Sequence, residues 1–80
     1  MYSYVMVFSS FYKASYAQEK LSADGVRSGL MRVPPGLINS CGYGLYLKEK
    51  DLKPAKKTLE NAGIRWSGLY RIEGQNYIRI

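Results

Sequence analysis

Apolar positions along the chain change from strand-like to helix-like spacing and back again. The first stretch, Tyr2–Phe8, is rich in aromatic and β-branched residues, which predicts a strand. Both faces of this strand are apolar, one with Tyr4, Met6 and Phe8 and the other with Val5 and Val7. That pattern is typical of a central strand that is covered on both sides.

The next stretch has the spacing of a helix. Ser9 or Ser10 can cap a helix that runs to about Asp24, and Gly25 is predicted to be its left-handed C-terminal residue. Apolar side chains recur every three or four residues along it, at Phe11, Ala14, Ala17 and Leu21. The spacing therefore predicts a helix with one buried face.

Two strands are predicted on either side of a loop. Val26–Val33 has a mixed pattern that includes Arg27 and Arg32, which favours an edge strand. Pro34 ends this strand, because proline has a fixed φ and no N–H to donate to a ladder. The chain is expected to resume as a strand at Tyr43–Leu47.

A second helix, glycine and strand follow. Asp51 is predicted to cap the helix, and Pro54 is tolerated in its first turn. Gly63 repeats the ending predicted at the first helix, and the fourth strand is expected over Ile64–Ile72. The inward positions of the second helix are Leu52, Ala55, Leu59 and Ala62.

The predicted order is β-α-β-β-α-β, with a turn at Gly74-Gln75-Asn76 and a short extra strand, Tyr77–Ile80. Right-handed crossovers arrange this order as an α+β, ferredoxin-like two-layer sandwich, with an antiparallel sheet and both helices on one face. Eighty residues form a single domain, residues 1–80, with a core over about 2–72 and a tail over 73–80.

The sheet face without helices, called the open face below, needs another cover. The first strand places either Tyr4, Met6 and Phe8 or Val5 and Val7 on it. An exposed apolar face of this kind is typical of an interaction site. Its cover can be a second subunit, a nucleic acid or the C-terminal tail, and the small size of the chain favours a homodimer.

Charge and composition exclude several kinds of chemistry. Twelve Lys and Arg against six Asp and Glu give a net charge of +6, which favours anionic partners or an acidic protein surface. The absence of histidine excludes a Cys–His dyad, a Ser–His–Asp triad and most zinc sites, so we expect neither a metal nor a cofactor. A single cysteine and the lack of a signal segment or membrane-spanning stretch predict a reducing, cytoplasmic location.

Cys41 is the candidate reactive residue, in the sequence Asn39-Ser40-Cys41-Gly42 just before a strand restarts. An ordinary thiol has a pKa of about 8.5, so a carrier needs help to form the thiolate. Backbone N–H groups of the turn, the Asn39 and Ser40 side chains and a cation such as Arg32 can supply it, while Gly42 allows close backbone approach. Without a second cysteine, Cys41 cannot run a dithiol cycle, but it can hold a persulfide-type adduct and pass it on.

Two other interpretations stay open. In the first, Cys41 is an inert, small apolar residue in an interaction or regulatory module. In the second, the open face binds RNA, because Gly42-Tyr43-Gly44 matches part of an RNA-recognition signature. Leu45 stands where that signature has a second stacking aromatic residue, and Lys48 stands at its last aromatic position. Nucleic-acid binding is therefore disfavoured.

Five stretches of the chain carry a resemblance to a known family. They are Tyr4–Phe8, Gly25-Val26, the loop Pro34–Gly42 with its Ser-Cys-Gly ending, Ala62-Gly63-Ile64 and Gly68-Leu69-Tyr70-Arg71. Together they resemble the family "Putative Se/S carrier protein-like" over roughly residues 2–72. The resemblance implies a carrier of selenium or sulfur rather than an independent enzyme, with Cys41 as the carrier residue, Ser40 and Gly42 as its motif neighbours, and donor and acceptor proteins as partners.

Overall fold

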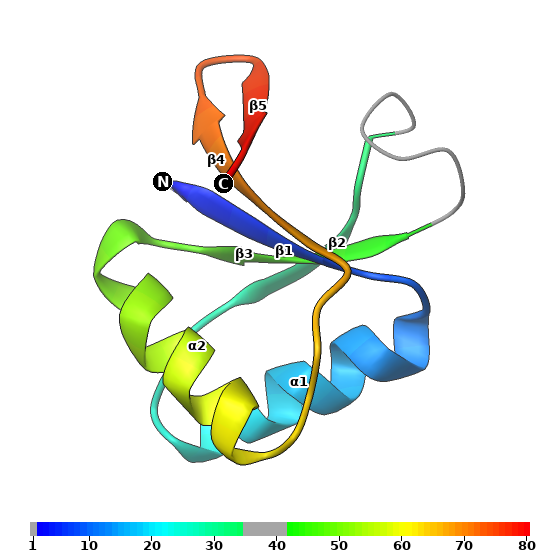
Figure 1. Cartoon of the computed structure of the whole chain (residues 1–80), viewed down its shortest axis with the longest axis vertical. Coiled ribbons are helices and arrows are strands. Elements are labelled where there is room, and N and C mark those ends of the chain that lie inside the picture. The colour runs from blue at the N-terminus through cyan, green and yellow to red at the C-terminus, as the bar shows by residue number, and fades with distance from the viewer. Residues whose placement is uncertain (1, 35–41) are drawn as a thin grey trace.

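The computed structural model describes residues 2–34 and 42–80. Its elements confirm the predicted ferredoxin-like order with an extra C-terminal strand (Figure 1). In chain order they are β1 (Tyr4–Phe8), α1 (Phe11–Ala23), β2 (Gly29–Arg32), β3 (Tyr43–Leu47), the 3-10 turn η1 (Glu49–Asp51), α2 (Leu52–Asn61), β4 (Gly68–Glu73) and β5 (Asn76–Arg79).

The strands form one antiparallel sheet in the order β2-β3-β1-β4-β5. The central strand β1 lies between β3 and β4, and β2 lies at an edge, as the mixed pattern of its sequence predicted. Both helices cover the same face of the sheet (Figure 1). The tail does not stay separate, because β5 pairs with β4 and extends the sheet.

Helix α1 begins and ends as predicted. The Ser10 hydroxyl accepts a hydrogen bond from the Lys13 N–H at 3.2 Å, which satisfies one of the free donors of the first turn. Gly25 has a φ of 78°, a conformation that glycine adopts without steric cost. The cap and the glycine together limit the helix to Phe11–Ala23.

Helix α2 differs from the prediction at both ends. The Asp51 side chain makes no capping hydrogen bond, because η1 already places its backbone in the helical region. Ala62 is exposed rather than inward, because it is the residue that follows the last helical turn. Ala55 and Leu59 are buried as predicted.

Two predicted strands begin later than expected, and for the same reason. The Val26 N–H donates to Leu21 O at 2.8 Å, and the Ile64 N–H donates to Leu59 O at 2.9 Å. Each residue therefore completes the end of a helix, and the strand starts only after the chain has returned to the sheet. As a result β2 begins at Gly29 and β4 at Gly68.

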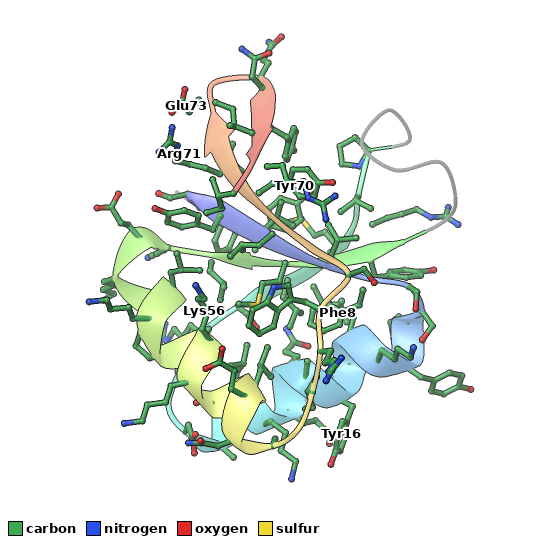
Figure 2. All side chains as sticks on the ribbon, in the orientation of Figure 1. Phe8, Tyr16, Lys56, Tyr70, Arg71 and Glu73 are labelled. Atoms are coloured by element: carbon green, nitrogen blue, oxygen red, sulfur yellow. The ribbon has the colours of Figure 1, made fainter. Side chains whose placement is uncertain are left out.

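The sheet separates two groups of buried side chains. The larger group lies between the sheet and the helices and includes Met6, Phe8 and Leu45. The smaller group lies on the open face and consists of Val5, Val7, Val33, Tyr46 and Tyr70. Figure 2 shows Phe8 on the helix side of the sheet and Tyr70 on the other side.

Candidate functional site

Gly42 closes the end of the ladder between β2 and β3. The Val33 N–H donates to Gly42 O at 3.2 Å, and both residues are buried. We call this pair the loop base, because residues 34–41 connect its two sides. Gly42 lies directly before β3, as the sequence predicted. The other three predicted site residues, Asn39, Ser40 and Cys41, lie outside the described residues.

A cation lies next to the loop base. Arg32 pairs with Tyr43 in the ladder, one position from Gly42, and its guanidinium carbon lies 5.9 Å from the centre of the Tyr43 ring. Phe11 packs edge-on against the same ring, with the ring centres 5.4 Å apart. The pairing of β2 with β3 thus holds Arg32 near Gly42, the residue to which Cys41 is bonded. In the sequence, Arg32 was only one candidate for a neighbouring cation.

Exposed aromatic side chains gather on helix α1. Phe11, Tyr12 and Tyr16 are 51%, 85% and 51% exposed. Tyr16 points away from the sheet (Figure 2), and the Lys20 ammonium lies 5.3 Å from the centre of its ring. The prediction that Phe11 is buried under the helix is wrong, because the first helical residue lies at the rim of the sheet, where it packs against Tyr43. This surface was not predicted from the sequence, although Tyr12 and Tyr16 are one helical turn apart.

Two tyrosine hydroxyl groups, those of Tyr46 and Tyr77, form a hydrogen bond on the open face. Burial, together with a hydrogen bond to Tyr77 and the nearby charge that Tyr77 can carry, raises the pKa of Tyr46 from 10.0 to about 12. Tyr46 is therefore uncharged near neutral pH. Its hydrogen bond with Tyr77 gives this largely apolar face one polar contact.

Tyr43 lies on the wrong face for RNA stacking by an open sheet. It packs beside the helix-side core and contacts Phe11, while its neighbour Gly44 faces the open side. The residues of β3 and β4 that do present rings there, Tyr46 and Tyr70, are each only 8% exposed. The match of Tyr43 to the RNA-recognition signature thus lacks the geometry that base stacking requires.

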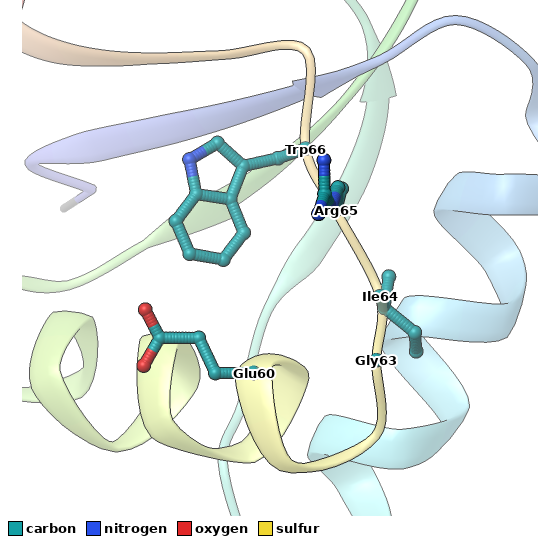
Figure 3. Close-up of a pocket in the computed structure, with 5 residues that line it drawn as sticks. All are labelled: Glu60, Gly63, Ile64, Arg65 and Trp66. Carbon is teal, nitrogen blue, oxygen red and sulfur yellow. The ribbon is translucent and has the colours of Figure 1, made fainter.

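Trp66 lines a cavity of about 510 Å³ together with Glu60, Gly63, Ile64 and Arg65. Figure 3 shows its indole projecting over α2 toward the Glu60 side chain. The ring is partly buried and packs against the helix-side core.

Within residues 2–34 and 42–80, we find no cluster of three or more cysteine and carboxylate side chains that could hold a metal ion. No helix in the same residues is long and apolar enough to cross a membrane.

Comparison with known proteins gives one match. Residues 3–71 match the model of the family described as "Putative Se/S carrier protein-like". No curated protein and no solved structure matches the chain. The matched range contains both sides of the loop base and all eight residues between them.

Proposed function

Because this chain belongs to the "Putative Se/S carrier protein-like" family, we propose that it carries sulfur or selenium on the thiol of Cys41. The observation that carries the proposal is the family match together with the presence of a single cysteine in the sequence. Cys41 is the only residue of this chain whose side chain is a thiol.

The transfer step is an exchange at sulfur. The Cys41 thiolate attacks the terminal sulfur of a donor persulfide, R–S–SH, so that a new S–S bond forms as the donor S–S bond breaks. The products are Cys41–S–SH and the donor thiolate, R–S⁻, and a terminal selenium atom transfers in the same way. An acceptor thiolate then attacks the outer atom and releases Cys41 as a thiolate, so that no external oxidant is needed.

Activation of the thiol must come from groups other than histidine, which the sequence lacks. Arg32, held at the loop base, supplies a positive charge that favours the thiolate. Asn39, Ser40 and the backbone N–H groups around Gly42 supply hydrogen bonds in the proposal. The pKa of Cys41 is then lower in the folded chain than in the unfolded one.

Donor and acceptor proteins need a surface beside the carrier loop. The exposed ring of Phe11 packs against Tyr43, close to the loop base, and the exposed ring of Tyr12 packs against Phe11. We propose that partners dock there. A net charge of +6 favours acidic partner surfaces. A reducing, cytoplasmic location suits the free thiol and belongs to the same proposal.

Self-association through the open face remains a prediction. Tyr2 and Met31, 38% and 45% exposed, are available on that face for a second copy. Sedimentation over a range of protein concentrations would show whether the chain is a dimer.

The thiol activation is tested by the pH dependence of Cys41 alkylation. We expect the native protein to react with a half-point well below that of the same protein in denaturant. Arg32→Gln should move the native half-point toward the denatured value, because the positive charge is lost. The control Arg27→Gln also removes one positive charge, but at a position away from the loop base. It should leave the half-point unchanged. A thiol that is protected in the native state, or titrates no lower than in denaturant, would favour the inert interaction module instead.

A further inference from the structure

A basic region lies at the end of strand β3 that is away from the loop base. There the chain forms a pocket of about 420 Å³ lined by Tyr2, Gly25, Arg27, Lys48, Lys50 and Asp51. We propose that this pocket binds a small phosphate ester. The proposal is separate from the carrier function, because none of these residues lies at the loop base.

Three chain segments, held by hydrogen bonds, form the pocket. The Ser3 N–H donates to Leu47 O at 2.8 Å, which holds the start of the chain beside the end of β3. The Asp51 N–H donates to Lys48 O at 2.9 Å and closes the turn that carries both lysines. The third segment is the turn after α1, in which Gly25 has a positive φ and Arg27 follows two residues later. The backbone of the pocket is therefore fixed by the sheet and by the end of α1.

The pocket carries an excess of positive charge. The side chains of Arg27, Lys48 and Lys50 are exposed, and none of them has a hydrogen bond or ion pair with another of the described residues. Asp51 is the single acidic residue of the lining, so the pocket has a net charge of +2. The one salt bridge among residues 2–34 and 42–80 lies elsewhere, between Arg71 and Glu73. Three neighbouring cations repel one another, and a bound dianion would relieve that repulsion.

The size and lining of the pocket favour a phosphate with an organic group attached. Lysine and arginine make charge-assisted hydrogen bonds to phosphate oxygens. A cavity of 420 Å³ exceeds the needs of a bare phosphate ion and falls in the range of small-molecule sites. The Tyr2 ring, 38% exposed and packed at a tilt against Tyr46, offers an aromatic wall for the rest of the ligand. A nucleoside monophosphate has both parts, so we use AMP as the probe.

The test is a titration of the isotope-labelled full chain with AMP, followed by amide NMR at constant ionic strength. We expect saturable shifts at residues 25–27 and 48–51, and none with adenosine or with chloride at equal ionic strength. Lys48→Gln and Arg27→Gln should each weaken AMP binding about three- to tenfold, as expected for the loss of one charge-assisted contact. The control Lys57→Gln removes an exposed lysine of α2 that is not part of the pocket and should leave affinity unchanged.

Several outcomes would overturn the proposal. Shifts that rise linearly without saturation, or that spread over lysines throughout the chain, would mean only general attraction of anions. An equal loss of affinity in Lys57→Gln would mean the same. Single-stranded RNA that binds these residues more tightly than AMP at equal phosphate concentration would identify a nucleic-acid site instead. Cys41→Ser should leave AMP binding unchanged, so this result is independent of whether the carrier proposal holds.

Discussion

The two faces of the sheet bury their side chains in different ways. On the helix-covered face, Met6 and Leu45 are fully buried beneath α1 and α2. On the open face, Val5 and Val7 are 0% and 2% exposed although no helix among residues 2–34 and 42–80 covers them. Aromatic side chains of the sheet itself provide that cover, because Tyr46 and Tyr70 belong to the same buried group and Tyr77 packs against it.

The hairpin of β4 and β5 explains how a single chain covers the open face. It rises from the sheet on the side away from the helices (Figure 1). Tyr77 of β5 thereby reaches Tyr46 of β3 and forms a hydrogen bond with it, although β1 and β4 lie between their strands. The C-terminal tail is thus one cover of this face, as the sequence analysis had considered. Burial of the valines does not require a second subunit.

The largest effect is expected on the helix-covered face. Met6→Ala should lower the free energy of unfolding by about 2–5 kcal/mol, because it leaves a cavity in the main core. Val5→Ala, on the adjacent residue of the same strand, removes two buried carbons and should cost about 2 kcal/mol. Urea denaturation at two protein concentrations measures both. A Val5→Ala midpoint that depends on concentration would show that the open face is buried by a partner copy instead.

Gly44 provides a test of how closely the open face is packed. An added Cβ would lie 2.5 Å from Val5 Cγ2 and 2.9 Å from Val33 Cγ1. Gly44→Ala should therefore cost about 1–3 kcal/mol through overpacking. Gly29→Ala is the matched control on the same face. Its Cβ would meet the Tyr2 hydroxyl at 2.7 Å, and that flexible ring can turn away. If thermal unfolding showed equal losses of stability for Gly44→Ala and Gly29→Ala, the result would contradict close packing around Val5.

The smallest effect concerns the hydroxyl pair. Tyr46→Phe removes one hydrogen bond to Tyr77 and should cost about 1 kcal/mol at neutral pH. The folded-state pKa of Tyr46 is raised to about 12, so its stabilisation is complete below the ordinary value of 10.0 and is lost as pH rises toward 12. Stability in that window should fall less steeply in Tyr46→Phe than in the original chain. Tyr12→Phe, on an 85% exposed ring, should change neither the stability at neutral pH nor its fall between pH 10 and 12.

Local patterns were enough to predict most of the fold. The limits of β3 and the left-handed Gly25 depend on residues close in sequence, and both were predicted correctly. A serine cap at Ser9 or Ser10 was also predicted, and the structure has it at Ser10. Alternation along β1 correctly placed Met6 and Val5 on opposite faces of the sheet. It did not show which of the two faces the helices cover. That choice depends on how the crossovers pack, which is a property of the whole sheet.

The errors arose where tertiary position overrode local pattern. Phe11 has the spacing of a buried helical residue, yet it lies at the rim of the sheet. Asp51 is a common type of cap residue, yet η1 leaves its side chain without that role. The basic pocket could not be predicted, because Tyr2, Arg27 and Lys48 come together only through strand pairing. Of the predicted carrier site, the described residues include only Gly42.

The carrier function itself is tested most directly by loading and transfer. The reduced protein is incubated with a low-molecular-weight persulfide and then with an acceptor thiol, and its intact mass is recorded at each stage. The account predicts a gain of one sulfur atom that is absent in Cys41→Ser and is lost when the acceptor thiol, now carrying that atom, is released. A native chain whose Cys41 alkylates readily but never gains or transfers sulfur or selenium would contradict the account.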